Sequence, residues 1–460
     1  MNTFKVLLLS FLINLAPALA GVEQAPPSFT IKGKKAVWLD FTSAKYELTF
    51  DIRNKKSVSV ATIDFDVLEK GYPIFDVVNT PRSISMNGTE YNQLEVQTPG
   101  GESKVRIIDR ELSPGNYTVR IVSDISNGVL FEKGGLSVGF FTKDMRDRNF
   151  LERYLPSNYE YDQYKMDISV NILGSKKKYK LFSNGSIVNE NSSHFHYTYP
   201  EYFSASSLYF HLVPVDKFKI LNFNYESRLE NGSNFPVTVY SKKTRLSRRV
   251  KRKIIKVLKE LENDYGPWPH PHLIFYADGK WKGGMEYAGA ATAGWFAIGH
   301  ELQHNYFARA VMPANGDAGW IDEAVASWRD FYKIHKYFHF GKERIKFDSM
   351  NLGSHSVYTR KTDLRSYKNG RALMFYLDSV LKDIPGKSLK KFLRSYFQER
   401  KFSTIKTEDF KNDLESYSGL SFKSFFDQYI YGLKKNTKST REKDFHFHTS
   451  LSESELQELL

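Results

Sequence analysis

The sequence predicts an α+β protein in which an antiparallel β sandwich or saddle-shaped sheet precedes a mostly helical domain. Two observations support this fold class. Through the first half of the chain apolar residues alternate with polar ones, which is the period of half-buried strands. From about residue 295 onward apolar residues recur at helical spacing instead. The 460 residues are too many for one small core, and a hydrophobic content of 41% is sufficient for two packed domains.

The first twenty residues have the organisation of a secretory signal peptide. Lys5 precedes an apolar run from Val6 to Ile13, and the segment ends in A-L-A, a cleavage pattern before Gly21. We therefore expect residues 1–20 to be removed during export, leaving a periplasmic or extracellular protein. The apolar run is too short to cross a bilayer, and no later run reaches about 20 apolar residues. No transmembrane segment is expected after signal removal.

The composition restricts the compartment and the partners. The chain has no cysteine, which excludes disulfides and thiolate zinc ligands and favours a bacterial exported protein. The net charge is +14, and the densest basic run, residues 245–253, carries apolar residues at helical spacing. We interpret it as the solvated face of an amphipathic helix and expect no nucleic-acid partner, because the run lacks interleaved aromatic residues. A basic surface could still attract acidic substrates or an anionic envelope.

Residues 21–235 are predicted to form the β-rich domain. Several segments alternate in polarity, and turn signals such as Asn87-Gly88 and Asn184-Gly185 separate them. The N-x-S/T triplets, including those at Asn116 and Asn184, are interpreted as turns as well. The alternating apolar positions are Tyr46, Leu48, Phe50 and Ile52, then Tyr117, Val119 and Ile121, then Met166, Ile168, Val170 and Ile172, and finally Leu208, Phe210 and Leu212.

Residues 236–433 are predicted to form the mostly helical domain. A basic helix and a strand open it, a glycine-rich segment follows, and helices occupy the remainder. Residues 434–460 are expected to be a polar tail with a short terminal helix. The expected helices are 246–264, 295–311, 320–335, 366–382, 387–399, 407–416 and 421–430, and the expected strand is 273–276.

The pattern H-E-L-Q-H at residues 300–304 indicates a zinc site. On a helix His300 and His304 share one face, so both imidazoles could reach one ion at about 2.0–2.1 Å. A catalytic zinc needs a third protein ligand, and Glu323 is the candidate. Glu301, beside the first ligand, is the candidate general base. The pattern alone arises by chance in roughly two of a hundred such chains, so its surroundings have to support it.

The chain resembles the aminopeptidase N family of zinc metallopeptidases, a gluzincin family that includes leukotriene A4 hydrolase. Gly284, Met285 and Glu286 resemble the end of the family's G-x-M-E-N motif. The zinc pattern and the W-I-D-E-A segment of residues 320–324 are separated as in the family. Residues 367–373 are similar to its Y-x-K-G-x-x-L helix start. These matches and weaker ones span roughly residues 140 to 430.

The resemblance implies a thermolysin-like catalytic domain, one Zn²⁺ per chain, and peptide substrates with a free N-terminus. It implies that Tyr367 stabilises the oxyanion through its hydroxyl. It also implies that Glu286, with Gly284 and Met285, binds the substrate. A carboxylate in such a glycine-rich extended stretch can bind an α-ammonium group while the backbone pairs with the peptide. That arrangement would place the cleaved bond one residue from the N-terminus.

Some features depart from the family and leave alternatives open. Tyr287 stands where the family has Asn, and the stretch between Glu286 and His300 is short. The family's second amine anchor has no assigned counterpart, with Asp144 and Asp147 as unaligned candidates. One alternative is a metallo-endopeptidase with an open cleft, and another is a non-catalytic peptide-binding module. The H-x-H pairs at 194–196, 270–272 and 446–448 lack a third ligand and are interpreted as surface or packing histidines.

Overall fold

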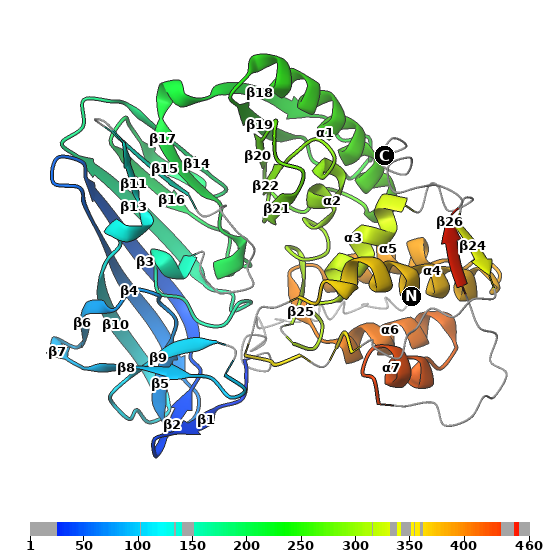
Figure 1. The fold of residues 1–460 in the computed structure, drawn as a ribbon, viewed down its shortest axis with the longest axis horizontal. Coiled ribbons are helices and arrows are strands. Elements are labelled where there is room, and N and C mark those ends of the chain that lie inside the picture. The colour runs from blue at the N-terminus through cyan, green and yellow to red at the C-terminus, as the bar shows by residue number, and fades with distance from the viewer. Residues whose placement is uncertain are drawn as a thin grey trace, which may run out of the picture.

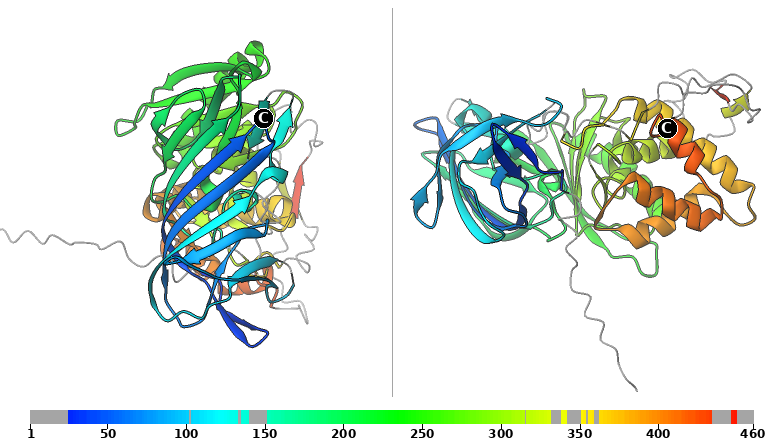
Figure 2. Two further views of the ribbon diagram at one scale, coloured as in Figure 1. Left: turned by 90° about the vertical axis from the view of Figure 1, so that its left-hand side faces the viewer. Right: turned by 90° about the horizontal axis from the view of Figure 1, so that it is seen from below.

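A β-rich half and a helical half make up the molecule, and they lie side by side in Figure 1 and in the view from below in Figure 2. The computed structural model describes residues 25–101, 103–132, 135–139, 151–314, 316–331, 338–341, 351–353, 355–358, 362–433 and 446–449. The expected signal peptide, Asp144, Asp147, and the expected terminal helix lie outside these residues. No helix in the described part of the chain is long and apolar enough to cross a membrane.

The largest sheet of the β-rich half has eight strands. Its alternating residues face one core, where Tyr46, Leu48 and Phe50 are at most 1% exposed. All neighbours are antiparallel except β3 and β13, which pair in parallel, so the sheet is mixed rather than wholly antiparallel. Parallel pairing is open to these two strands because a long crossover joins them. The order is β15 (Ser186–Glu190), β16 (His194–Thr198), β13 (Lys165–Leu173), β3 (Asp40–Asp51), β4 (Lys56–Val67), β10 (Gly115–Asp124), β6 (Pro81–Met86) and β7 (Thr89–Glu90).

Two smaller sheets complete this half. The residues Asn87-Gly88 form the expected tight turn, since both have positive φ and join β6 to β7. The residues Asn184-Gly185 instead connect strands of different sheets. One small sheet is β1 (Phe29–Ile31), β2 (Lys34–Val37), β5 (Tyr72–Phe75), β9 (Lys104–Ile108) and β8 (Gln93–Gln97); the other is β11 (Leu130–Glu132), β12 (Gly135–Gly139), β17 (Phe210–Pro214) and β14 (Tyr179–Ser183).

A five-stranded mixed sheet opens the second half and ends in the glycine-rich strand. The order places β21 at the sheet edge, where it pairs with β22 alone among the described strands. The hairpin of β18 and β19 spans residue 235, so a domain boundary at that residue would divide a hairpin. The sheet is β18 (Lys219–Tyr225), β19 (Phe235–Ser241), β20 (Leu273–Ala277), β22 (Ala290–Ala293) and β21 (Gly284–Tyr287).

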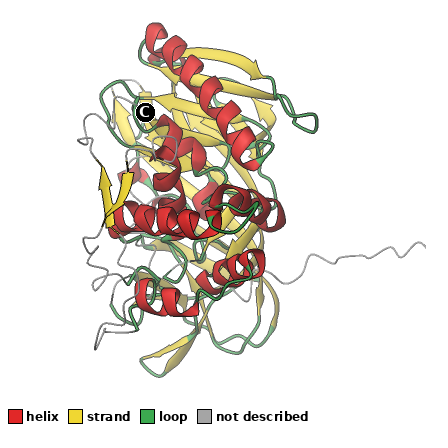
Figure 3. Ribbon diagram, turned by 90° about the vertical axis from the view of Figure 1, so that its right-hand side faces the viewer, coloured by secondary structure: helices red, strands yellow, loops and turns green. Residues whose placement is uncertain are grey.

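Helices cover this sheet and form most of the rest of the second half that the structure describes, as the red ribbons of Figure 3 make visible. The basic helix α1 buries its apolar stripe, including Val250, Ile254 and Leu258, as the sequence pattern predicts. Its basic side lies outward, where Arg249 and Lys253 pack over the ring of Trp295. The helices are α1 (Thr244–Tyr265), α2 (Ile298–Gln303), α3 (Ile321–Phe331), α4 (Arg371–Lys382), α5 (Leu389–Arg400), α6 (Thr407–Ser418) and α7 (Lys423–Tyr429).

The helix that carries the histidine motif is shorter than the sequence predicts. A helix over 295–311 was expected, but α2 ends at Gln303. Ala308 has φ of 148°, which a helix cannot contain, and its N–H donates to Val311 O at 2.9 Å. The chain therefore turns and enters a strand. Two further strand pairs are β23 (Val311–Pro313) with β25 (Ser403–Ile405), and β24 (Phe338–Gly341) with β26 (His446–Thr449).

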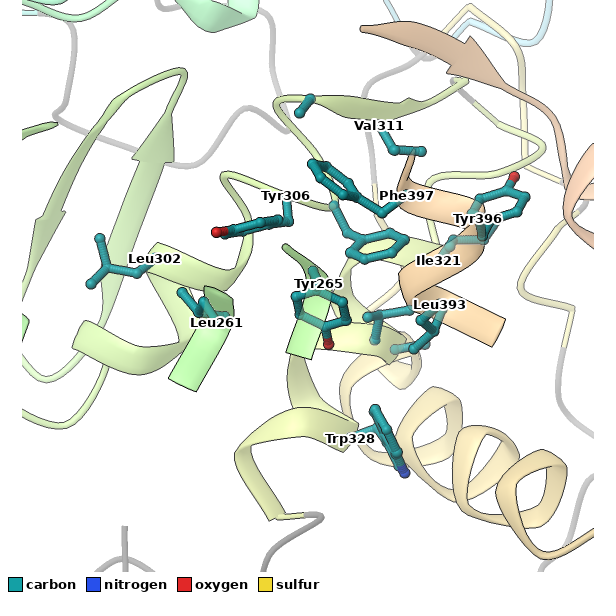
Figure 4. Close-up of a cluster of buried hydrophobic side chains, with 14 of the residues drawn as sticks. Leu261, Tyr265, Leu302, Tyr306, Val311, Ile321, Trp328, Leu393, Tyr396 and Phe397 are labelled. Carbon is teal, nitrogen blue, oxygen red and sulfur yellow. The ribbon is translucent and has the colours of Figure 1, made fainter. Parts of the chain in front are cut away.

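One hydrophobic core joins the sheet and the helices around the motif. Leu302 of α2, Leu261 of α1 and Ile321 of α3 are all fully buried in it. Aromatic rings fill the space between these helices and α5, with Tyr306 and Phe397 at a centroid distance of 4.9 Å (Figure 4). Burial on this side of α2 leaves its other side for the histidines and Glu301.

Candidate metal centre

Helix α2 places two histidines one turn apart on the side away from the core. Ile298 and Leu302 are completely buried beneath the helix, which fixes its rotation. His300 and His304 then project together, and their Nε2 atoms lie 3.1 Å apart. The i, i+4 spacing expected from the sequence is therefore realised, although the helix ends at the second histidine.

Glu323 on α3 brings the third donor to the same point. Its Oε2 lies 3.1 Å from His300 Nε2 and 3.3 Å from His304 Nε2. Ligand atoms about 2.0–2.1 Å from one tetrahedral zinc ion are separated by roughly 3.3 Å, so this donor triangle has the size that zinc requires. Among the described residues, these three form the one cluster of histidine and acidic side chains that could hold a metal. The donor set fits a single Zn²⁺ ion.

Both histidines are oriented from behind by their other ring nitrogen. His300 Nδ1 lies 2.9 Å from Asp330 Oδ2, and His304 Nδ1 lies 3.2 Å from Phe307 O. Such contacts fix the ring orientation and make Nε2 the metal-binding atom. The sequence interpretation missed Asp330. Its signal was available, because Asp330 follows Glu323 by seven residues and so lies on the same face of α3 two turns later.

Glu301 points into the site from the same helix as the histidines. The residue is 5% exposed, and burial raises the pKa of Glu301 to about 8, while the neighbouring histidines act to lower it. A carboxyl group of this kind exchanges a proton near neutral pH. Gly284 makes its position available, since a Cβ atom at Gly284 would lie 2.3 Å from Glu301 Cγ and Oε1.

Tyr367 reaches the metal donors from a π-helical turn, Ser366–Gly370, that precedes α4. Its hydroxyl donates to Glu323 Oε1 at 2.5 Å, and its ring stacks on the His300 ring at 6.0 Å. Although 40% of the residue is exposed, the hydroxyl is directed inward. Burial and the charge of Glu323 raise the pKa of Tyr367 well above its usual value. The phenol therefore stays protonated and available as a hydrogen-bond donor.

Glu286 lies on the edge strand β21 and is buried, with 9% of the residue exposed. Its Oε1 accepts a hydrogen bond from Arg309 Nη2 at 2.8 Å. Glu286 therefore does not lie in a solvated turn. Met285 and Gly284, its predecessors on the strand, are half-buried. Nothing in the sequence pattern singled out Arg309, which only the folded turn after α2 brings to this strand.

Two further acidic residues surround this region. Asp322 accepts a hydrogen bond from the backbone N–H of Glu323 at 2.6 Å, and burial together with Glu323 raises the pKa of Asp322 to about 8. Glu160, in the β-rich half, is 2% exposed and acts electrostatically on Arg309. Both were missed from sequence: Asp322 lies within the W-I-D-E-A segment, where only Glu323 was assigned a role, and Glu160 belongs to no motif. Together with Glu286 they give the site a strongly acidic character.

The other histidine pairs have local partners. His194 Nδ1 lies 2.8 Å from Asn171 Oδ1, and His196 Nε2 lies 2.9 Å from both oxygens of Asp167. Buried His270 contacts Asn305 O through Nε2 at 3.0 Å. These contacts suit histidines of a sheet face and of a core. The side chains of 446–449 lie outside the description.

Comparisons with known proteins agree with this geometry. Residues 295–429 match the model of the peptidase family M1 domain. The fold is similar to the M1 zinc metallopeptidase from Deinococcus radiodurans, with a TM-score of 0.61, 16% identity, and coverage of 87% of this chain and 95% of that one. It is also similar to yeast LTA4 hydrolase, with a TM-score of 0.62, 13% identity, and coverage of 87% and 69%.

No curated protein sequence matches the chain. The family match nevertheless covers both the histidine motif and Glu323, and the structural similarity extends over most of the chain as a two-domain α+β fold. The donor triangle provides a place for the zinc ion of that family. The chain therefore carries a domain of peptidase family M1, the aminopeptidase N family of zinc metallopeptidases.

Proposed function

We propose that this zinc metallopeptidase is an aminopeptidase, which hydrolyses the N-terminal peptide bond of peptides with a free N-terminus. One observation carries the proposal: the buried carboxylate of Glu286 on an edge strand beside the metal donors. Its charge acts on Glu301, His304 and Tyr367, so it lies within electrostatic reach of the reacting groups. An ammonium group held there would position the first peptide bond near the metal centre.

In the proposed mechanism His300, His304 and Glu323 hold the zinc ion. When bound, zinc on such donors lowers the pKa of a coordinated water toward 7 and polarises a carbonyl group. Glu301 takes a proton from the attacking water and later returns it to the leaving amine. The hydroxyl of Tyr367 donates a hydrogen bond to the oxygen that becomes negative.

Strand β21 would align the peptide. Its outer edge offers backbone N–H and C=O groups to an extended substrate, which can add as a further strand. Gly284 has no side chain that could obstruct this edge, and its missing Cβ atom leaves room for the Glu301 side chain. A mutant of the Deinococcus enzyme has been crystallised with a Tyr-Ser-Ala substrate, at 15% identity to this chain and a TM-score of 0.59. That structure supports short peptides as the substrate class to test first.

The test compares three substrates with the zinc-loaded protein. A free-amine aminoacyl amide, its N-acetylated form and an internally quenched peptide are assayed for kcat/KM, with Glu301→Gln as the inactive control. We expect the free-amine substrate to be cleaved at least 100-fold better than the acetylated one. Equal cleavage of both would contradict the aminopeptidase proposal and favour the endopeptidase alternative.

Two further variants separate chemistry from binding. Tyr367→Phe removes only the hydroxyl, and we expect kcat to fall roughly 100-fold with zinc content unchanged, as for other oxyanion donors. Glu286→Gln should raise KM for the free-amine substrate more than it lowers kcat, because it removes the charge that binds the ammonium. Absence of all cleavage in a zinc-loaded protein would favour the peptide-binding alternative.

A further inference from the structure

We propose that Arg309 is a positioning residue that holds Glu286 in the orientation that receives the substrate's α-ammonium group. This inference rests on the proposed aminopeptidase function. Arg309 is 1% exposed and follows His304 by five residues. Its guanidinium connects the edge strand β21 with the β-rich half of the molecule, so both halves contribute to the amine site.

The two ends of the guanidinium have different partners. Nη2 donates to Glu286 Oε1 at 2.8 Å, and Nη1 donates to Ser206 Oγ at 2.9 Å. A planar guanidinium presents its donors in a fixed fork, so an anchor at one nitrogen sets the direction of the other. Ser206 therefore fixes the approach of Arg309 to Glu286. A lysine could supply the charge but not this two-sided geometry.

Glu286 needs a cation because its surroundings are acidic. Glu301 and Asp322 are buried and each interacts electrostatically with Glu286, and the buried Glu160 of the β-rich half interacts with Arg309. Without Arg309, repulsion from these carboxyl groups would favour a displaced Glu286 side chain. With Arg309 bound to Oε1, the Glu286 side chain keeps its place, and Oε2 is the oxygen that meets the ammonium.

The backbone turn before Arg309 sets the direction of the Arg309 side chain. Ala308 has φ of 148°, a conformation that a residue with a Cβ atom adopts only when its surroundings enforce it. Three backbone hydrogen bonds enforce it here: Arg309 N to His304 O at 3.0 Å, Ala308 N to Val311 O at 2.9 Å, and Val311 N to Tyr306 O at 2.9 Å. The strained turn thus ties Arg309 directly to the end of the histidine helix.

Ser206, which accepts the hydrogen bond from Arg309 Nη1, lies in a segment that further hydrogen bonds hold in place. Its neighbour Ser207 accepts hydrogen bonds from Ala288 N at 3.1 Å and from Asn184 Nδ2 at 2.7 Å. Asn184 Nδ2 further donates to Ala288 O at 2.6 Å, immediately beyond strand β21. Ser206 and the strand of Glu286 are therefore parts of one hydrogen-bonded junction, and Arg309 closes it from the side of the metal centre.

The test measures the amine contribution to binding without turnover. Leucine hydroxamate and 4-methylpentanohydroxamate differ only in the α-amino group, and both bind zinc through the hydroxamate. Their Kd values are measured by calorimetry for the zinc-loaded wild type, Arg309→Met and Arg309→Lys, with zinc content determined for each. Arg400→Met is the matched control, because Arg400 pairs with Asp413 on the helical half, away from the site.

We expect Arg309→Met to weaken leucine hydroxamate at least tenfold while the des-amino compound changes less than twofold. Arg309→Lys should lose part of the preference for leucine hydroxamate over the des-amino compound, and Ser206→Ala should lose a smaller part of it. Arg400→Met should lose none of this preference. KM for a free-amine substrate should rise in parallel, with kcat little changed. In Glu286→Gln, adding Arg309→Met should bring no further loss, because both changes remove the same interaction.

An unchanged ratio of the two Kd values in Arg309→Met would overturn the inference, as would an equal loss for both compounds, which indicates a purely structural role. If Arg309→Met does not fold, Arg309→Lys and Ser206→Ala decide by the same ratio. The wild type separates this inference from the proposed function: no preference for the amine there refutes both, whereas a preference that survives every Arg309 variant refutes the positioning role alone.

Discussion

Gly284 is the residue whose missing side chain makes room for the candidate general base. In Gly284→Ala the new Cβ would lie 2.3 Å from Glu301 Cγ and Oε1, so Glu301 has to move. We expect kcat/KM to fall by about 10²–10⁴, the range for loss of a general base, while zinc stays bound. Steady-state kinetics with a zinc assay measures this.

Gly283→Ala is the matched control for that substitution. The atoms nearest to a Cβ atom at Gly283 would be those of the Trp281 ring, at 3.4 to 3.7 Å, which is ordinary contact. Its activity should remain within about twofold of wild type. If both variants lose activity equally, flexibility of the strand rather than the space beside Glu301 is the reason for the glycines.

Ala308 stores backbone strain at φ of 148° and is 1% exposed. Ala308→Gly should raise the free energy of unfolding by about 1 kcal/mol, because relief of one to three kcal/mol of strain exceeds the extra chain entropy of glycine. Buried Ala310, two residues later, is the control, and Ala310→Gly should destabilise by about 1 kcal/mol, because it frees the unfolded backbone and removes a buried methyl group. Urea midpoints measure both, and a destabilised Ala308→Gly would contradict the prediction.

At the scale of elements, α3 serves the metal centre twice. It carries Glu323 in its first turn and Asp330 in its last, where Asp330 contacts His300 Nδ1 at 2.9 Å. Asp330→Asn should weaken zinc affinity about 10- to 100-fold, the usual effect of removing such a partner. Competition with a chromophoric chelator measures the affinity, and restoring zinc should restore activity. The exposed Asp383→Asn should leave both unchanged.

The segment before β13 carries a buried acid, Asp162, that makes the β-rich half sensitive to pH. Its Oδ2 accepts hydrogen bonds from Phe41 N at 3.1 Å and Asn158 Nδ2 at 2.9 Å, yet burial raises the pKa of Asp162 to about 8. A raised folded pKa contributes stability that is complete below about pH 4 and is lost as the pH rises toward 8. The loss of stability across this pH range is at most about 6 kcal/mol.

Asp162→Asn should remove this dependence, so that the variant gains stability relative to wild type as the pH rises from about 4 to about 8. Asp64 is the control of opposite sign, because hydrogen bonds from Thr118 and Ser43 lower the pKa of Asp64. Asp64→Asn should be less stable than wild type at neutral pH, and the difference should vanish in acid. Urea unfolding at several pH values measures both, and parallel curves for wild type and Asp162→Asn would refute the assignment.

At the scale of the whole molecule, Asn184 joins the two halves. It is fully buried, donates to Ser207 O and Ala288 O, and accepts from Tyr209 N at 2.8 Å. Asn184→Ala should cost about 3–5 kcal/mol, because Tyr209 N and Ala288 O lose this partner and Ser207 O keeps only Ala288 N. Asn116, in an exposed N-x-S/T triplet, is the control, and Asn116→Ala should change stability by less than about 0.5 kcal/mol. Thermal unfolding measures both.

The fold class and the zinc donors were predictable because they depend on short-range patterns. The alternation of apolar and polar residues predicts which face of β3 is buried. The i, i+4 spacing predicts that His300 and His304 lie on the same side of α2. The predicted length of this helix was wrong, because the end of α2 depends on the strained turn at Ala308 and on the pairing of β23 with β25. The boundary at residue 235 and the signal peptide stay predictions.

By itself the sequence determined the chemistry of the donors: two imidazoles at helical spacing, a glutamate on the next helix and no cysteine. Only the tertiary structure decided how the remaining polar groups meet. Arg309 and Ser206 belong to no local pattern, and Asp330, although it shares a face of α3 with Glu323, meets His300 only through the packing of α3 beside α2. The physical reason is that residue spacing along one helix or strand sets the direction of its side chains. Contacts between side chains of different elements depend instead on how the hydrophobic core packs those elements together.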